Sequence, residues 1–236
     1  MSNEFLSTVG TQEEAGAVSR AQFVVNAYIY LGGAILAFVL LSFALHYTGF
    51  GFAVLSAMAT SQYVWLGILG AFMVVGWLAS SIADKAESNT TQIMGLGIYV
   101  IAEACIFSPL FALAAARMPG AIPVAVIATI LLTVGLTWTA ISSKKDFSFL
   151  GGMLRIGGLV ALGAIVAGVI FGFSLGIWFS AAMILFAGGC ILYDTSNILR
   201  HYPTDRPAGA ALHLFASVAL LLWYVLRFVM QFASDD

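Results

Sequence analysis

The chain has 236 residues, of which 61% are hydrophobic and 8% are charged, and its mean hydropathy is +1.02. Soluble domains carry roughly a quarter charged residues, so this composition excludes a protein whose main solvent is water. The formal net charge of -2 is too small to indicate a nucleic-acid partner or a polybasic lipid anchor. The composition therefore predicts an integral membrane protein that contacts the lipid bilayer and binds no nucleic acid.

Apolar runs long enough to cross a bilayer recur along the chain. A bilayer core about 30 Å thick needs about 20 mostly apolar residues in a helix. Seven runs meet this length, and we expect them at 23–47, 63–82, 93–115, 121–141, 149–171, 175–199 and 210–232. We therefore predict an all-α membrane protein with a polar cytoplasmic tail at 1–22, a seven-transmembrane-helix bundle at 23–232 and a short tail at 233–236.

Lysine and arginine are distributed unequally between the two sides of this bundle. The connections on the side of the amino terminus carry six of them: Arg20, Lys85, Lys144, Lys145, Arg200 and Arg206. The opposite connections carry only Arg117. Because short cytoplasmic loops are enriched in lysine and arginine, we predict that the amino terminus lies in the cytoplasm and the carboxyl terminus outside.

Ionisable side chains inside a bilayer need a partner, a cavity or a proton, since a charge at the centre of a membrane helix costs roughly 3 kcal/mol. Glu103 lies near the middle of the third predicted span, where it either binds an ion or sits protonated in a structural hydrogen bond. Arg227 lies toward the outer face, where its guanidinium can snorkel to the surface.

Arg155 and Asp194 lie at similar depths in the cytoplasmic third of the fifth and sixth spans, counted by helix rise. We predict an ion pair between them, a structural latch that keeps the carboxylate ionised and hydrogen-bonded. In the alternative, Arg155 snorkels to the surface and Asp194 bonds to Ser217, His213 or water.

A polar stripe runs along the seventh span. His213, Ser217, Tyr224 and Arg227 are spaced by four, seven and three residues, so they share one helical face, which we expect to look into the bundle. A lone histidine on such a stripe is more often a packing residue than a metal ligand. With no second histidine or paired cysteine at ligand spacing, the sequence predicts no metal site and no cofactor.

The segment 172–176 matches the G-x-S-x-G pattern of serine hydrolases. That motif needs a strand before it and a helix after it, whereas here it joins two membrane helices. Ser174 maps to the outer end of its helix and His213 to the cytoplasmic end of another, so no base comes within reach of the hydroxyl. We predict that the protein is not an enzyme.

The fifth span is rich in glycine, with six glycines between 151 and 168. Small residues let membrane helices approach closely. We expect this helix near the centre of the bundle.

Four parts of the sequence carry distinctive motifs: 145–154 (KDFSFLGGML), 191–198 (ILYDTSNI), 212–215 (LHLF) with 226–228 (LRF), and, more weakly, 106–110 (IFSPL). In these motifs the chain resembles the Bax inhibitor-1 family, and in particular its bacterial YccA-like branch. The resemblance implies a seven-helix bundle whose last helix is surrounded by the other six, in the inner membrane of a bacterium. It also implies either restraint of an FtsH-type membrane protease or a pH-sensitive calcium leak. The leak is attributed to two aspartates; the first corresponds to Asp194 and the second falls at Ser217.

Two functions therefore compete. The first is binding and modulation of a membrane AAA protease of the FtsH type. The second is a pH-sensitive leak for Ca²⁺, H⁺ or another cation through Glu103, Asp194 and His213. A serine beside one aspartate offers fewer oxygens to a hard cation than two aspartates do, which favours the first function.

Overall fold

The computed structural model describes residues 2–61, 63–143 and 145–233, and all regular secondary structure in these ranges is α-helical. The helices are α1 (Ser2–Tyr47), α2 (Phe50–Thr60), α3 (Tyr63–Lys85), α4 (Asn89–Arg117), α5 (Ala121–Ser142), α6 (Leu150–Phe171), α7 (Gly176–Arg200) and α8 (Pro207–Phe232). Within the described ranges, seven of these helices are long and apolar enough to cross a membrane. The predicted all-α bundle of seven spans is confirmed. Lys144 and the tail residues 234–236 lie outside the described ranges.

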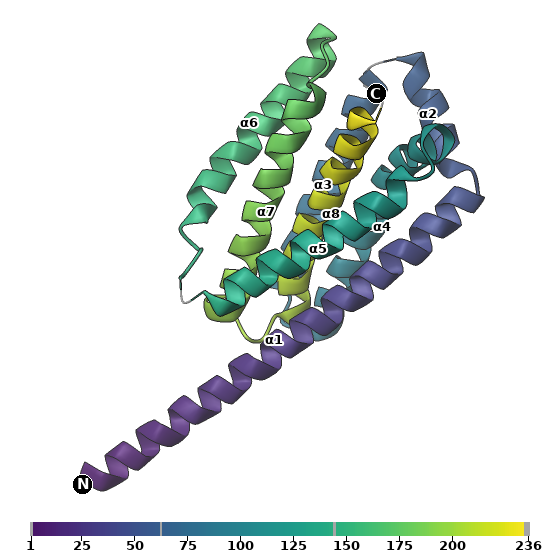
Figure 1. The fold of residues 1–236 in the computed structure, drawn as a ribbon. Coiled ribbons are helices and arrows are strands. Elements are labelled where there is room, and N and C mark those ends of the chain that lie inside the picture. Colours follow the sequence, from purple (N-terminus) through teal and green to yellow (C-terminus); the bar gives the residue numbers. More distant parts are fainter. Residues whose placement is uncertain (1, 62, 144, 234–236) are drawn as a thin grey trace.

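Helix α8 forms the centre of the bundle (Figure 1). It contacts α1, α3, α4, α5 and α7, and 67% of its most apolar 18-residue window is buried. Its first turns consist of small residues, which are almost completely covered by the neighbouring helices. The small side chains let the other backbones approach closely. The last helix is central, as the family resemblance implies, but it contacts five of the other six spans, because α6 does not pack against it.

Helix α1 is longer than its span. The apolar part runs from Val18 to Tyr47, but the helix begins at Ser2, and its amino-terminal portion projects well beyond the other helices (Figure 1). The Arg20 guanidinium donates to the Tyr202 carbonyl oxygen between α7 and α8, which fixes α1 to the bundle where the projection starts. The segment predicted as a separate polar tail is therefore helical and continuous with the first span.

Helix α2 was not predicted, because its 11 residues rise only about 16 Å and cannot cross the bilayer. It lies between the first two spans and starts after Gly49, whose φ of 73° makes the turn. Gly51 then packs directly on α4, where a Cβ would overlap the carbonyl oxygen of Ser108. A glycine is thus required for this close approach of two backbones.

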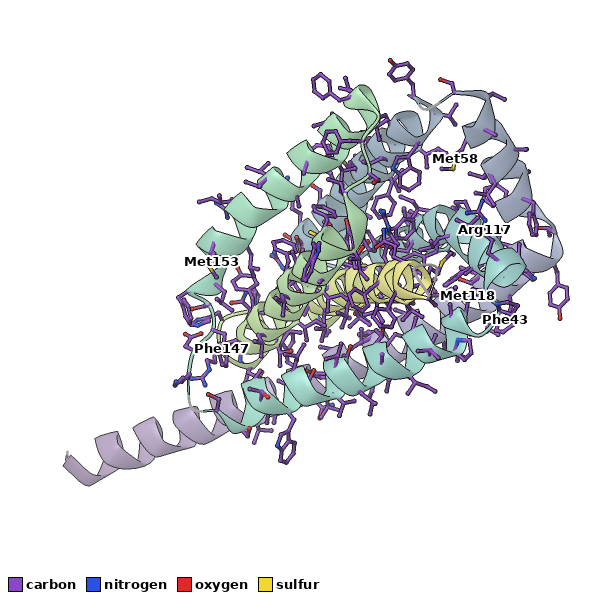
Figure 2. The ribbon with its side chains drawn as sticks, turned by 45° about the horizontal axis from the view of Figure 1, so that its top comes forward. Phe43, Met58, Arg117, Met118, Phe147 and Met153 are labelled. Carbon is purple, nitrogen blue, oxygen red and sulfur yellow. The ribbon has the colours of Figure 1, made fainter. Side chains whose placement is uncertain are left out.

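Helix α6 lies at the edge of the bundle, and the expectation that it would be central is wrong. Only 6% of an 18-residue apolar stretch of α6 is buried, and α6 packs chiefly against α7. Figure 2 shows Met153 directed away from the bundle, and its side chain is 63% exposed. The glycines serve one contact face: a Cβ at Gly151 would meet the Tyr193 ring, and one at Gly157 would meet the Phe186 ring.

Helices α3 and α4 pack closely through a different glycine. A Cβ at Gly95 would lie 2.8 Å from the Ala79 carbonyl oxygen and 3.1 Å from the Ala83 Cβ. At Gly97, two residues further along the same helix, a Cβ would meet nothing within 4 Å. The α3–α4 contact therefore depends on one of these two glycines and not on the other.

Candidate functional site

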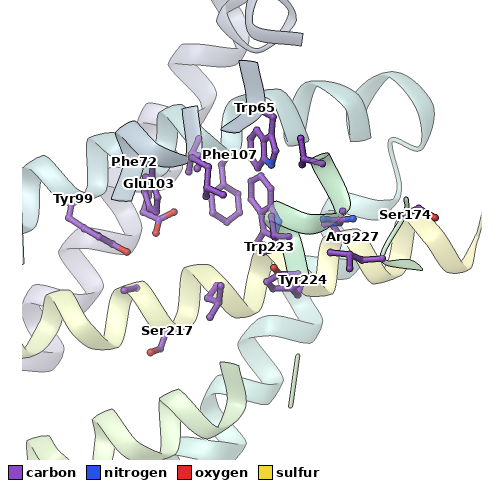
Figure 3. Close-up of a pocket in the computed structure, with 18 of the residues that line it drawn as sticks. Trp65, Phe72, Tyr99, Glu103, Phe107, Ser174, Ser217, Trp223, Tyr224 and Arg227 are labelled. Atoms are coloured by element: carbon purple, nitrogen blue, oxygen red, sulfur yellow. The ribbon is translucent and has the colours of Figure 1, made fainter. Parts of the chain in front are cut away.

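A cavity of about 470 Å³ opens among α3, α4, α6 and α8, beside the turn between α6 and α7 (Figure 3). Seven aromatic side chains contribute to its wall: Trp65, Phe72, Tyr99, Phe107, Phe173, Trp223 and Tyr224. Its polar residues include Glu103 and Ser217, with Arg227 and Ser174 toward the outer end. The volume lies in the range of small-molecule sites, so the cavity is the first candidate for a binding site.

Glu103 is 5% exposed, and the hydroxyl of Tyr99, one turn earlier on α4, lies near enough to interact with its carboxyl group. Tyr99 is therefore a candidate partner for the structural hydrogen bond that is one of the two roles expected of Glu103. The carboxyl group also borders the cavity, so its second expected role, contact with an ion or proton, is sterically open.

Asp194 on α7 accepts a hydrogen bond of 2.5 Å from the Ser217 hydroxyl on α8. The thiol of Cys190, one turn earlier on α7, lies near the same hydroxyl. Ser217 is 8% exposed and borders the cavity as well, so this one hydroxyl connects the cavity to the carboxyl group of Asp194. The serine occupies the position that the resemblance assigns to a second aspartate.

The ion pair predicted between Arg155 and Asp194 is wrong. Arg155 lies on the exposed face of α6, and no ion pair joins the two side chains in the described part of the chain. Arg155 and Asp194 were predicted to lie at similar depths in the membrane, but a similar depth does not make two side chains face each other. The alternative, in which Asp194 bonds to Ser217, is the arrangement found.

His213 instead meets a carboxylate on α3. Its Nε2 lies 3.0 and 3.1 Å from the two carboxylate oxygens of Asp84, and the Tyr202 hydroxyl donates to one of those oxygens at 2.6 Å. The Arg206 guanidinium donates to the Asp84 backbone carbonyl. Three segments are thereby joined at one end of the bundle: the end of α3, the α7–α8 loop and the start of α8.

This Asp84 cluster was missed in the sequence. The signal that could have found it is depth: Asp84 comes two residues after the second predicted span (63–82) and His213 lies in the first turn of the last one (210–232), so both lie at the same face of the membrane. Tyr202 belongs to the loop between spans, where burial and the neighbouring Asp84 carboxylate raise the pKa of its hydroxyl. The hydroxyl therefore remains a hydrogen-bond donor at neutral pH.

A second polar cluster fixes the α5–α6 loop to the end of α7. The Asp146 carboxylate accepts from the Ser148 backbone N–H at 2.9 Å, from the Ser196 hydroxyl at 3.0 Å, and lies 2.7 Å from Nε2 of His201. These hydrogen bonds, that of the Ser148 N–H first, hold the pKa of Asp146 well below its ordinary value. The motif stretches 145–154 and 191–198 meet here, so their side chains hold neighbouring helices together.

The remaining predicted residues are also placed. Ser217, Tyr224 and Arg227 border the cavity, so the expectation that the stripe on the last span faces the bundle is confirmed for them. Ser174 borders the outer part of the cavity, whereas His213 bonds to Asp84 near the opposite end of α8, so the structure does not join them as nucleophile and base. Within the described ranges, no three histidine, cysteine or acidic side chains are grouped as metal ligands.

These features define a multi-pass membrane protein in which one buried helix borders a mainly apolar cavity and takes part in a polar cluster at the opposite end. The family model described as inhibitor of apoptosis-promoting Bax1 matches residues 20–234, and the chain belongs to this Bax inhibitor-1 family.

Among curated proteins, an uncharacterised protein of Pseudomonas aeruginosa is 33% identical over 109 residues, which is 46% of this chain and 49% of that protein. The modulator of FtsH protease YccA from Escherichia coli K12 is 36% identical over 97 residues, 41% of this chain and 43% of that protein. The same match holds for the inner membrane protein YccA of a second Escherichia coli strain. The matches thus span less than half the length of these relatives. With the seven apolar helices, they support a multi-pass protein of the bacterial inner membrane.

Proposed function

We propose that this protein binds a membrane AAA protease of the FtsH type and modulates its activity, without being an enzyme itself. The observation that carries the proposal is the similarity to a protein named as a modulator of FtsH protease, at 36% identity over 97 residues. Membership of a family named for inhibition agrees with a regulatory role.

The polar interior supports the same function. The carboxyl group of Asp194 is engaged by a serine hydroxyl, and a hydroxyl–carboxyl pair is a poorer site for a hard cation than two carboxylates. The Asp84 and Asp146 clusters join helices and loops to one another. Such contacts hold a rigid bundle, which is what a binding protein needs.

We further propose the orientation in which the amino terminus, Lys85 and Arg206 face the cytoplasm. The excess of lysine and arginine in the connections on that side supports it. In this orientation the projecting part of α1 lies in the cytoplasm, and the segment at 1–22 extends the first span.

Co-purification tests the binding. The tagged full-length chain should capture an FtsH-type protease from detergent-solubilised bacterial membranes, and an unrelated seven-helix membrane protein carrying the same tag should not. Equal recovery of the protease with both proteins would contradict the proposal.

A second candidate function is a pH-sensitive cation leak. Glu103 and Ser217 border one cavity, Ser217 bonds to Asp194, and His213 and Asp194 lie near enough to interact electrostatically. Glu103, Ser217, Asp194 and His213 therefore form a series of polar side chains that runs from the middle of the bundle toward the end where Asp84 lies.

Calcium flux into liposomes separates the two functions. We expect little flux with the wild-type chain and more with Ser217→Asp, which supplies the second carboxylate. Ser217→Asn is the matched neutral control. A large wild-type flux that Asp194→Asn abolishes would favour the leak and would count against a purely modulatory role.

A further inference from the structure

The outer end of the cavity holds a guanidinium without an acidic partner. Arg227 borders the cavity and is half-buried, and no carboxylate pairs with it in the described part of the chain. A half-buried cation in a membrane span needs an anion or water, and the neighbours of Arg227 here are mainly aromatic, with Trp223 and Tyr224 preceding it on α8. The site therefore presents positive charge that an anionic ligand would complement.

The depth of the cavity matches half a bilayer. Along α8 the cavity extends from Ala216 and Ser217 to Arg227, ten or eleven residues that correspond to about 15 Å of helix rise. The hydrocarbon core of one leaflet is also about 15 Å thick, half of about 30 Å. Arg227 lies five residues before the end of α8, near the surface on the side of the carboxyl terminus. A headgroup at Arg227 thus places a hydrocarbon chain along the cavity toward Ser217.

The wall suits a hydrocarbon chain. Trp65 and Trp223 stack with ring centroids 5.8 Å apart, and Phe107 meets Trp223 edge-on at 5.1 Å. Glu103 and Tyr99 lie next to each other farther from Arg227 along the same wall. Helices α3 and α6 both line the cavity and pack only lightly against each other, and the cavity is not fully enclosed.

A second cavity of about 370 Å³ adjoins the first at the same guanidinium. Arg227, Trp65 and Trp223 border both cavities, and the second continues between α2, α4 and the end of α8. Two apolar spaces that meet at one cation match a ligand with two hydrocarbon chains and one anionic headgroup better than a ligand with a single chain.

We propose that these two cavities bind an anionic phospholipid from the leaflet on the carboxyl-terminal side, with its phosphate on Arg227, one acyl chain along the first cavity and the other along the mainly aliphatic wall of the second cavity. This site is independent of the protease partner, and it gives the bundle a bound lipid between α6 and the helices around α8.

Tryptophan quenching tests the site. Three other tryptophans, Trp77, Trp138 and Trp178, are 69% to 84% exposed, and their replacement by phenylalanine leaves Trp65 and Trp223 as the reporters. This triple variant is reconstituted in phosphatidylcholine bilayers with increasing fractions of chain-brominated phosphatidylglycerol or chain-brominated phosphatidylcholine. We expect the anionic lipid to quench half of the fluorescence at a mole fraction several-fold lower than the zwitterionic lipid. Equal quenching by the two lipids would overturn the proposal. This comparison needs no substitution among the residues that line the cavities, so a folding defect cannot explain its result.

Two arginine variants and one competitor complete the test. Arg227→Met should abolish the preference for the anionic lipid, whereas Arg117→Met, which removes an exposed arginine from the same end of the bundle, should retain it. A preference that persists in Arg227→Met would overturn the assignment to this guanidinium. Recovery of fluorescence with unbrominated phosphatidylglycerol is the expected competition. If only dodecanoate restores the fluorescence, the cavity binds a free fatty acid, and the proposed phospholipid site is wrong.

Discussion

The contact between Asp84 and His213 should contribute measurable coupling energy, whereas the pair that depth alone suggested should not. The test is a double-mutant cycle with Asp84→Asn, His213→Ala and both changes together. Hydrogen bonds to charged groups contribute about 1.5 to 3 kcal/mol. The two side chains are 38% and 39% exposed, so solvent screening reduces the expected coupling to about 1 to 2 kcal/mol.

Each single substitution should lower the free energy of unfolding by more than the coupling energy between the two side chains. Asp84→Asn also weakens the acceptor of the Tyr202 hydroxyl, while the contact of Arg206 with the backbone carbonyl of residue 84 remains. Equilibrium unfolding in mixed detergent micelles measures all four proteins of the cycle. The control cycle, Arg155→Met with Asp194→Asn, should be additive, because no contact joins those side chains in the described ranges.

Two results would contradict an Asp84–His213 contact with no Arg155–Asp194 pair. The first is an Asp84–His213 coupling below about 0.5 kcal/mol, which is the usual scatter of additive sites. The second is a coupling of equal size in the control cycle, which would mean that α6 is packed so that Arg155 reaches Asp194.

Three further predictions concern packing, pH and orientation. Gly95→Ala should destabilise the bundle by about 1 to 3 kcal/mol in the same unfolding assay, because its Cβ meets the α3 backbone, whereas Gly97→Ala should be neutral or stabilising; equal effects would contradict the packing. Because the pKa of Asp146 is lowered in the folded protein, its stabilisation is present above the unfolded value of about 4 and is lost as the pH falls through the lower folded value. The thermal midpoint of Asp146→Asn should therefore fall less in acid than that of the wild type, and an unchanged acid response would count against these hydrogen bonds, with Asp205→Asn as a control in a neighbouring loop. A cysteine at Ala233 should react with membrane-impermeant thiol reagents in intact cells, above the background of the two native cysteines, and protection until lysis would reverse the proposed orientation.

The number of spans could be predicted from the sequence because membrane helices must satisfy their backbones internally over a fixed thickness. Apolar runs of about 20 residues therefore carry the signal, and all seven appear as helices. The same length criterion could not reveal α2, whose 11 residues are too few.

Which faces meet was harder to predict than which segments span. Glycine content suggested a central α6, but only one face of that helix uses its glycines, and the other face is exposed. Depth placed Arg155 beside Asp194, yet rotation about the helix axes turns the two side chains to different surfaces. The polar stripe on α8 succeeded because four spaced residues define a rotation as well as a depth.

Protease modulation is tested most directly by the rate at which an FtsH-type protease degrades a membrane substrate in liposomes that also contain this protein. We expect the rate to fall as the protein-to-protease ratio rises, and an unrelated seven-helix protein at the same density to have no effect. An unchanged degradation rate at saturating protein, in liposomes where the protein is folded, would contradict a modulatory function.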